Sequence, residues 1–265
     1  MTTPILMLGA GRMGGAMVQG WLASRAFAAS DLILRDPHPG EAALAAAANG
    51  ARLNPPDADL AAAPTVVLAV KPQIWREAAA EMAPRLARDA TIVSIAAGVA
   101  LDDIARAVGG RPVARVMPTT AAAIGQGTAS IFARDPAARA RAHALFAPLG
   151  TVVDIAEEDL MHAATAVSGS APAYLYAFLE ALEAAGVDAG LTPEAASRLA
   201  RSTITGAAAL LAKGGEDPAE LRRQVTSPGG VTQAALEVLM AEAGFPGLMR
   251  AAAAAAIRRS KELGG

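Results

Sequence analysis

A glycine-rich turn near the N-terminus is the first feature with a chemical purpose. The motif Gly9-Ala10-Gly11-Arg12-Met13-Gly14 directly follows the apolar run "ILML" and opens a helical pattern over 13–24. In a strand–turn–helix unit the first glycine permits a tight turn, the second lets a pyrophosphate approach the backbone, and the third lets the helix pack on the strand. The helix N-terminus then holds the anion. We therefore expect these six residues to bind a dinucleotide; the alternative is a turn with a purely structural role.

Two charged residues at the end of the second apolar run favour different cofactors. Asp36, in "LILRDP", lies roughly where the dinucleotide fingerprint places an acid that bonds the ribose 2′-hydroxyl, which favours NAD. Arg35 beside it could accept a 2′-phosphate, which favours NADP. Side chains alternate along a strand, so only one of the two is expected to face the ribose easily. A solvated pair at a strand end is the alternative for both.

Loops after later apolar runs outline one rim, because an open α/β sheet binds its ligands at the C-terminal ends of its strands. These loops are "AVKPQ" (69–73), "SIAAGV" (94–99) and "RVMPTT" (115–120), and the small side chains of the second leave room for a flat ring. Taken alone, each is more often a plain loop. From the first two we expect cofactor contacts by Ala69, Val70, Lys71, Pro72, Ala96, Ala97 and Gly98.

The chain shows no self-contained catalytic constellation. It has three histidines and no cysteine, which excludes disulfides, a thiol nucleophile and thiolate metal sites. His38 and His143 are expected at the surface, and His162 is expected to have a packing role. We find no Ser–His–Asp spacing, HExxH or paired-carboxylate pattern, and we expect no metal site. This fits hydride transfer, in which the cofactor does the chemistry and the protein orients the reactants.

The elements that position these motifs divide the chain in two. Short β-branched runs alternate with Ala-rich helical stretches up to about residue 155, which favours a parallel sheet covered on both faces. After Glu157 only helical patterns follow, at 158–167, 172–187, 193–213, 218–225, 230–242 and 246–262. The expected strands cover 4–8, 31–35, 65–70, 91–95, 112–117, 128–133 and 151–155. We predict an α/β fold: a Rossmann-type dinucleotide-binding domain over 1–156 and an all-α domain over 157–265.

Charge and apolar runs limit the partners. The net charge is -2 with acids and bases interspersed, so nothing indicates nucleic-acid binding. The longest apolar runs, such as "AAAAAAI" at 251–257, fall far below the ~18 residues of a membrane span. No basic segment or cleavage site precedes "ILML". We expect a cytoplasmic protein that does not insert into membranes.

Six motifs in this order and spacing resemble the pyrroline-5-carboxylate reductase family. They are "GAGRMG", "AVKP", "SIAAGV", "RVMP", "VSGSAPAY" and "QVTSPGGVTQAALEVL", and they cover nearly the whole chain. The last two are the most discriminating, since the first is shared with most nucleotide-binding reductases. The resemblance implies reduction of 1-pyrroline-5-carboxylate to L-proline, the last step of proline synthesis, with NADPH or alternatively NADH. It also implies a helical dimerisation domain and a homodimer, often assembled into larger rings.

With this substrate, the stretch "VTSPGGVTQAAL" (225–236) gains a purpose. Paired glycines are poor helix material, yet they precede a helical pattern. Unpaired N–H groups and the positive end of the helix dipole attract an anion, and missing side chains let a compact carboxylate reach the backbone. We therefore expect substrate binding by Ser227, Gly229, Gly230, Val231 and Thr232, against the alternative of a plain cap. The proton for the imine nitrogen comes from water or from a hydroxyl such as that of Thr232.

This sequence departs from the family pattern at three positions. Thr119 stands where the family usually has Asn, and a hydroxyl cannot copy the paired donor and acceptor of an amide. A cofactor or substrate contact at 119 is therefore not carried over. Val231 stands where Thr or Ala is common, which leaves only a backbone role there. Ala171 replaces a usual Gly or Ser, which is a mild change.

Two other functions compete with the reductase. A β-hydroxyacid dehydrogenase shares the "GxGxMG" start and a helical second half, but it would place a catalytic Lys on an early helix of that half, and residues 158–190 contain none. A non-catalytic dinucleotide sensor would not need a second anion site. The apolar circumference of the helices at 172–187 and 193–213 further favours an obligate dimer, because a helix apolar on most sides must be buried on most sides.

Overall fold

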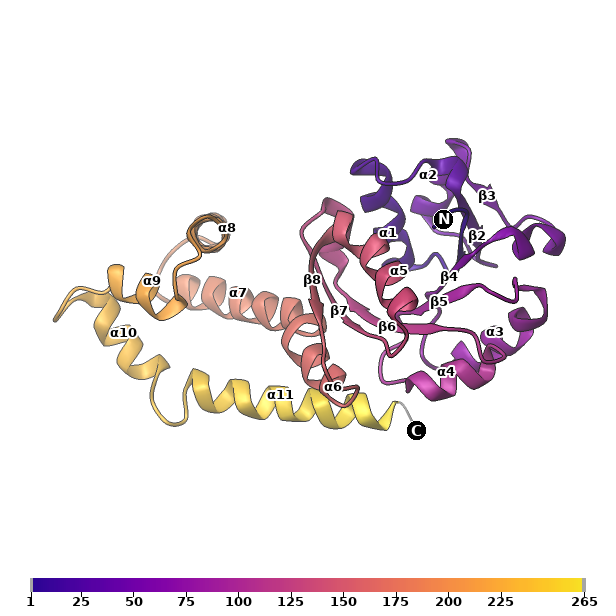
Figure 1. The fold of residues 1–265 in the computed structure, drawn as a ribbon. Helices are drawn as coiled ribbons and strands as arrows, with labels where there is room; N and C mark the ends of the chain where they lie inside the picture. Colours follow the sequence, from indigo (N-terminus) through magenta and orange to yellow (C-terminus); the bar gives the residue numbers. More distant parts are fainter. Residues whose placement is uncertain (1, 264–265) are drawn as a thin grey trace. The chain divides into compact units, whose positions relative to one another are not determined.

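The computed structural model describes residues 2–263, and an eight-stranded sheet forms the centre of the N-terminal part (Figure 1). The strand order is β3-β2-β1-β4-β5-β6-β7-β8. Neighbouring strands pair in parallel except β6 and β7, which are antiparallel. The strands are β1 (Ile5–Leu8), β2 (Leu32–Arg35), β3 (Arg52–Leu53), β4 (Thr65–Leu68), β5 (Thr91–Ser94), β6 (Val113–Pro118), β7 (Gly127–Phe132) and β8 (Gly150–Asp154).

All of the strands expected from the sequence are present, with ends shifted by one or two residues. The expected parallel pairing is found between all neighbouring strands except β6 and β7. A parallel neighbour needs a long crossover connection, whereas only a short 3₁₀ helix, Thr120–Ile124, links β6 to β7. Helix α5 (Pro136–Phe146) then provides the crossover that lets β8 pair with β7 in parallel.

Helices cover both faces of the sheet, as expected for a Rossmann-type fold. One core contains Met7 and Leu34 with residues of α1 (Arg12–Ala23), α2 (Glu41–Ala48) and α5. The other contains Leu8 and Ile33 with residues of α3 (Trp75–Met82) and α4 (Leu101–Ala107). Adjacent strand residues thus enter opposite cores, because side chains alternate across a strand. Every strand residue of β1 and β4 is buried, and this holds the C-terminal ends of both strands in place.

The C-terminal part is helical, as expected. Its elements are α6 (Leu160–Ala164), a π-helical turn (Thr165–Gly169), α7 (Ala171–Asp188), α8 (Pro193–Gly214), α9 (Pro218–Gln224), α10 (Val231–Leu239) and α11 (Phe245–Glu262). The expected caps are also present. Thr192 Oγ1 accepts from the N–H of Ala195 at 3.2 Å, and Asp217 Oδ1 accepts from the N–H of Ala219 at 2.7 Å. Pro follows each cap at the first helical position, where its missing N–H costs nothing.

Two compact units emerge from the contacts within the chain. The second unit is Ser170–Ala254, and the first combines the chain up to Gly169 with residues 255–263. The boundary expected from the sequence, 156/157, marks where strands give way to helices. The first unit extends further because Met161 and Ala166 are buried with the sheet domain, and because His162 Nδ1 lies 2.9 Å from Ser260 Oγ.

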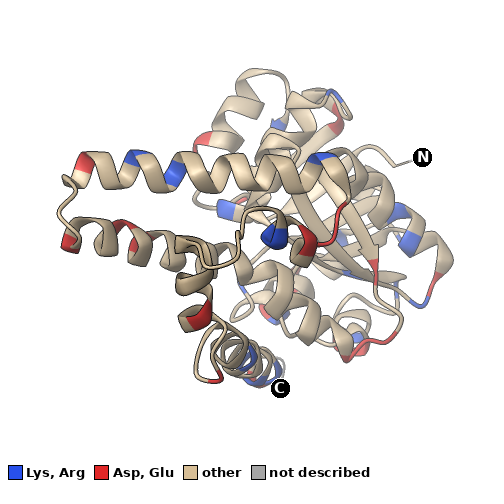
Figure 2. Cartoon of the chain, turned by 90° about the vertical axis from the view of Figure 1, so that its left-hand side faces the viewer, with Lys and Arg blue, Asp and Glu red and all other residues tan. Residues whose placement is uncertain are grey.

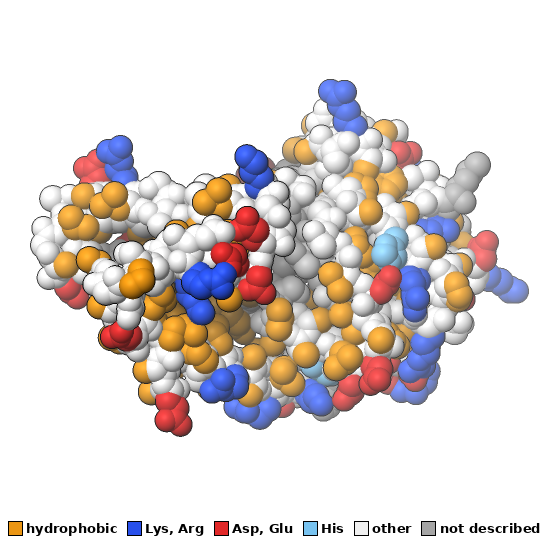
Figure 3. Space-filling view, turned by 60° about the vertical axis from the view of Figure 1, so that its left-hand side comes forward, with side chains coloured by type: hydrophobic (Ala, Val, Ile, Leu, Met, Phe, Trp, Pro, Cys, Tyr) orange, Lys and Arg blue, Asp and Glu red, His pale blue; other side chains and the backbone are white. Residues whose placement is uncertain are grey.

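The second unit has almost no core of its own. Only Ala196 and Ala200 are buried among residues 170–254. Many large apolar side chains are exposed, among them Val231 at 91%, Val238 at 74% and Leu210 at 64%. Figure 2 shows long uncharged stretches on these helices, and Figure 3 shows hydrophobic side chains across their surface. Such exposed apolar patches mark interaction surfaces in soluble proteins.

Two kinds of feature are missing from residues 2–263. No helix there is long and apolar enough to cross a lipid bilayer. No group of His, Cys, Asp or Glu side chains there is arranged to hold a metal ion.

Candidate active site

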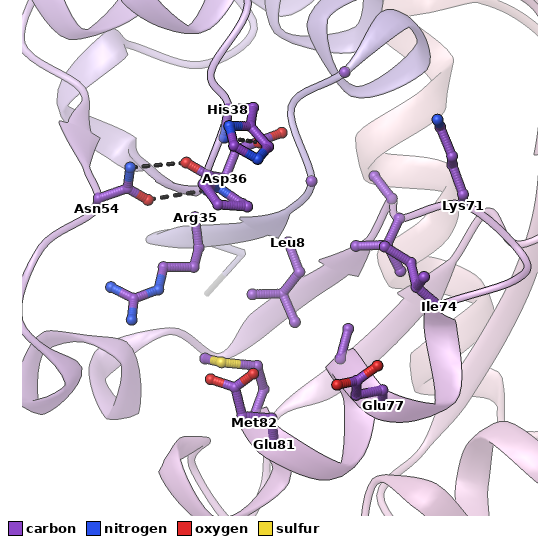
Figure 4. Close-up of a pocket in the computed structure, with 16 residues that line it drawn as sticks. Leu8, Arg35, Asp36, His38, Asn54, Lys71, Ile74, Glu77, Glu81 and Met82 are labelled. Atoms are coloured by element: carbon purple, nitrogen blue, oxygen red, sulfur yellow. Dashed lines mark hydrogen bonds between the residues drawn. The ribbon is translucent and has the colours of Figure 1, made fainter.

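A cleft of about 780 Å³ opens at the C-terminal ends of β1, β2 and β4 (Figure 4). The strand order reverses between β1 and β4, and this is where open α/β sheets bind their ligands. Leu8 lies at the centre of the labelled side chains, between the end of β2 and the start of α3. The lining residues are Leu8, Gly9, Gly11, Arg35, Asp36, Pro37, His38, Asn54, Ala69, Val70, Lys71, Ile74, Glu77, Ala78, Glu81 and Met82.

The three glycines of the turn have different surroundings. Gly9 has φ +91°, and a Cβ added there would meet the Ala69 carbonyl oxygen at 2.8 Å. Gly11 has open space, with nothing within 4 Å of an added Cβ. At Gly14 an added Cβ would overlap the carbonyl oxygen of Gly9, so helix and turn could not approach this closely. These are the conditions that a tight turn, an approaching phosphate and a close helix–strand contact require.

The start of α1 offers free hydrogen-bond donors. Within the described residues the N–H groups of Arg12, Met13 and Gly14 have no acceptor. Gly11, the residue before the helix, has no side chain that could accept from them. Gly15 N–H is the first to bond back into the chain, to the carbonyl oxygen of Gly11 at 2.7 Å. Free N–H groups at a helix start, next to open space, can bind an anion such as a phosphate.

Asp36 at the end of β2 is held against the glycine-rich turn. Its Oδ2 accepts from the N–H of Ala10 at 2.6 Å, and its Oδ1 accepts from the N–H of His38 at 2.8 Å. Asn54 fixes the backbone of Asp36 from both sides. Asn54 Nδ2 donates to the Asp36 carbonyl oxygen at 2.8 Å, and Asn54 Oδ1 accepts from the Asp36 N–H at 3.0 Å. The dashed lines between these two residues are visible in Figure 4.

Arg35 also lines the cleft, but its guanidinium group is engaged elsewhere. Nη1 donates to the Pro55 carbonyl oxygen at 3.1 Å, and Nη2 lies 3.2 Å from Asp57 Oδ1. The other oxygen of Asp57 lies 2.7 Å from Arg85 Nε. Arg35 and Asp36 therefore both line the cleft. Of the two, only Asp36 is bonded to the glycine-rich turn.

The later loops contribute unequally to the cleft. Ala69, Val70 and Lys71 line it, whereas Pro72 and residues 96–98 do not. Ala96 and Gly98 follow β5 in the sequence and are buried, and β5 pairs with β4 in the sheet. Within the glycine-rich motif, the residues that do not line the cleft are Ala10, Arg12, Met13 and Gly14.

One wall of the cleft was not predicted from the sequence. Asn54 lies in an irregular loop after the two-residue strand β3, with φ +48°, and no motif marks it. Helix α3 supplies the remaining lining residues, Ile74, Glu77, Ala78, Glu81 and Met82. A signal existed for the helix, because it begins directly after the "AVKPQ" loop and must pass beside the cleft.

The second candidate site, the loop 225–232, lies in the second unit. Three of its N–H groups are already used: Thr226 donates to the Arg223 carbonyl oxygen at 3.1 Å, Gly230 to the Ser227 carbonyl oxygen at 3.0 Å, and Gly229 to Gln233 Oε1 at 2.7 Å. The N–H groups of Val231, Thr232 and Gln233 have no acceptor among the described residues. The N–H groups without an acceptor therefore begin at Val231, directly after the two glycines. Gln233 is added to the candidate substrate-binding residues expected from the sequence.

Comparison with known proteins identifies the family. Residues 158–263 match the family model described as pyrroline-5-carboxylate reductase dimerisation, and residues 4–98 match the model described as NADP oxidoreductase, coenzyme F420-dependent. A pyrroline-5-carboxylate reductase of Pseudomonas aeruginosa is 38% identical over 99% of this chain and 98% of its own length. The chain belongs to the pyrroline-5-carboxylate reductase family.

Further members of the pyrroline-5-carboxylate reductase family match the chain over nearly its whole length. The Synechocystis protein of that name is 36% identical over 100% of this chain and 99% of its own length. A crystal structure of Plasmodium falciparum pyrroline carboxylate reductase with NADP bound has a TM-score of 0.85 at 26% identity, covering 99% of this chain and 98% of that one. The expected function is thereby confirmed: an NAD(P)H-dependent oxidoreductase that reduces 1-pyrroline-5-carboxylate to L-proline. The dimerisation match indicates a homo-oligomer.

The Thr119 departure from the pyrroline-5-carboxylate reductase pattern has a structural role. Thr119 Oγ1 accepts from the N–H of Thr128 at 3.0 Å and so joins the two ends of the short β6–β7 connection. The histidines do not form a catalytic group. His143 Nε2 lies 3.0 Å from Asp154 Oδ2, and burial, with a smaller effect of Arg115, lowers the pKa of His162. His38 alone lines the cleft, and it is exposed.

Proposed function

We propose that the chain performs the family reaction with its cofactor in the cleft of β1, β2 and β4 and with the imine carboxylate at the start of α10. The observation that carries this proposal is the presence of two helix starts, α1 and α10, whose N–H groups lack acceptors. A dinucleotide and a cyclic imino acid each bring an anionic group, and each helix start matches one of them. The first unit would thus hold the hydride donor, and the second would hold the acceptor.

The residues of the cleft fit a dinucleotide. Open space at Gly11 and the free donors of Arg12, Met13 and Gly14 would hold the pyrophosphate. Asp36 would face the ribose next to the adenine, while apolar side chains of α3 would cover the adenine ring. Ala69, Val70, Lys71, Pro72, Ala96, Ala97 and Gly98 would follow the rest of the cofactor along the sheet edge. When bound, NAD(P)H supplies the hydride that the imine carbon accepts.

The loop before α10 would orient the substrate. The N–H groups of Val231, Thr232 and Gln233 would bind the carboxylate, with the hydroxyl of Ser227 as a further donor. Gly229 and Gly230 would shape the loop, since Gly229 has φ +69° and a Cβ at Gly230 would overlap the Ser227 hydroxyl. We assign the proton for the imine nitrogen to the Thr232 hydroxyl, which water then reprotonates. Hydride at carbon and proton at nitrogen together convert the C=N bond to the amine.

We propose further that the working unit is a homodimer, or a ring of such dimers, with sites built from two chains. The second unit exposes most of its large apolar side chains, including Leu210 and Val238, and a second copy of the same surface would bury them. In such a dimer the 225–232 loop of one chain would meet the cofactor held by the other. The cytoplasmic location stays a prediction, which cell fractionation would test.

A cofactor-oxidation assay tests the proposed function. Purified protein is given NADPH or NADH with 1-pyrroline-5-carboxylate, and in parallel with a panel of 3-hydroxy acids and the oxidised cofactors. We expect turnover with the cyclic imine alone. Turnover with a 3-hydroxy acid and none with the imine would refute the proposal. A protein that binds the dinucleotide but turns over nothing would instead be a sensor.

A further inference from the structure

We infer that the ribose end of the cleft selects against a 2′-phosphate, so that this enzyme prefers NADH to NADPH. The inference rests on the proposed placement of the dinucleotide in the cleft. It goes beyond that placement by assigning the selection to Asp36, to Asn54 as its positioning residue, and to Asp57, which withholds Arg35 from the cofactor.

Asp36 directly follows β2, where the dinucleotide fingerprint places the acid that bonds the ribose hydroxyls. Its carboxylate bonds the N–H of Ala10 inside the glycine-rich turn, and this fixes it beside the start of α1. A carboxylate offers about four acceptor positions, and the two backbone N–H groups occupy two of them. The remaining positions can accept from the 2′- and 3′-hydroxyl groups of an unphosphorylated ribose. A 2′-phosphate carries nearly two negative charges and has little proton to donate, so the same carboxylate repels it.

The carboxylate cannot easily turn away from a phosphate. Asn54 makes two hydrogen bonds to the backbone of Asp36, and its own N–H donates to the Leu34 carbonyl oxygen at 2.8 Å. Asn also tolerates the left-handed backbone found at this position better than other side chains do. The end of β2 is therefore fixed on both sides, by the glycine-rich turn and by the loop after β3. Turning the carboxylate away would break its bonds to the N–H groups of Ala10 and His38, and the Asn54 bonds keep the backbone of Asp36 from moving instead.

The cation that would bind a 2′-phosphate is already neutralised. Arg35 is the arginine among the residues that line the cleft, and it is paired with Asp57 and bonded to the Pro55 carbonyl oxygen. Asp57 is itself fixed by Arg85 at 2.7 Å. Lys71 belongs to the loop after β4 and lies on the other side of Leu8 from Asp36 in Figure 4. A phosphate at the ribose would thus meet a fixed anion, and the arginine that lines the cleft is already paired with a carboxylate.

Binding of two cofactor fragments tests the inference without relying on turnover. ADP-ribose and 2′-phospho-ADP-ribose are titrated into the intact protein by calorimetry, and NADH and NADPH are compared by kcat/KM with the imine. A charge-assisted hydrogen bond replaced by like-charge repulsion predicts a preference for ADP-ribose of roughly tenfold or more. If neither fragment binds, the cleft is not the cofactor site and the proposed function itself fails. If both bind and the 2′-phosphorylated one binds as tightly or more tightly, only the selectivity inference fails.

Three variants locate the origin of the preference. Asp36→Asn keeps the size of the side chain and removes its charge, and it should abolish the preference mainly by tightening 2′-phospho-ADP-ribose. Asp57→Asn should free Arg35 and tighten the same fragment several-fold while leaving ADP-ribose unchanged. Asp59→Asn is the matched control, because it removes one charge nearby and touches neither Arg35 nor the cleft lining. An unchanged preference in Asp36→Asn, or an equal effect of Asp59→Asn, would overturn the assignment.

Discussion

A negative charge placed at the start of α10 is the sharpest test of the substrate site. Thr232→Asp puts a carboxylate on the second residue of the helix, where an acid is favourable for the helix itself, so the fold should be kept. The new carboxylate would take the free N–H groups of Val231, Thr232 and Gln233 for itself and repel the carboxylate of the substrate. Thr232→Asn has a similar size without the charge and is the control for KM, and because both variants lack the hydroxyl assigned to the proton, kcat should fall in both.

The magnitude follows from the donors that the substrate would lose. A hydrogen bond to a charged group contributes about 1.5–3 kcal/mol, and a helix start adds up to about 2 kcal/mol. Losing about 2–4 kcal/mol of substrate binding corresponds to a KM increase of roughly 30-fold to 1000-fold. Steady-state kinetics should show this rise for Thr232→Asp, while Thr232→Asn changes KM much less and cofactor affinity stays constant in both. A folded Thr232→Asp protein with an unchanged KM would refute a carboxylate site at this helix start. Gly230→Val is a poorer probe, because its Cβ would overlap the Ser227 hydroxyl and move the loop.

Four further predictions concern the cofactor, the assembly and the stability of the first unit. Gly11→Val fills open space at an ordinary φ of -68°, so the melting temperature should stay within a few degrees while dinucleotide binding, measured by calorimetry, is lost. Co-refolding of Gly11→Val with Thr232→Asp should regain activity if two chains share a site, and no recovery at any mixing ratio would exclude sharing. Glu158→Gln leaves Arg115, only 5% exposed and 2.6 Å from Glu158, without its ionic partner, and denaturant unfolding should show a loss of about 3 kcal/mol. The folded state lowers the pKa of His162, mainly through burial, so on acidification the unfolded chain binds a proton at this histidine before the folded chain does. The free energy of unfolding should therefore fall as the pH drops below about 6.5. Melting curves of His162→Asn should show a smaller fall.

Local patterns in the sequence were enough to predict much of this molecule. Buried runs such as "TVVL" at Thr65–Leu68 and caps such as Thr192-Pro193 each encode one element, because periodicity and capping act within a few residues. The glycine-rich turn was also predictable, since the strained φ of Gly9 and the close approach at Gly14 demand those residue types. The family resemblance then supplied the substrate, which no local pattern contains.

Features that depend on distant partners could not be predicted. The reversal of β7 depends on how a short connection folds, and the role of Asn54 depends on a bond to Asp36, which lies 18 positions earlier. Arg35 and Asp36 favoured opposite cofactors in the sequence. Their different roles become visible only when Asp57, 22 positions after Arg35, is seen to hold the guanidinium group.

The return of the last helix to the first unit constrains how the chain is made. Residues 255–263 complete the N-terminal unit, and Ser260 and Lys261 reach His162 and Asp159. On the ribosome, the nucleotide-binding part can begin to fold early, yet its final contacts must wait until residues 255–263 have been translated. A chain that stops shortly before residue 255 would keep nearly all of the second unit and would still lack part of the first. The nucleotide-binding domain is therefore finished only by residues that follow the whole second unit in the sequence.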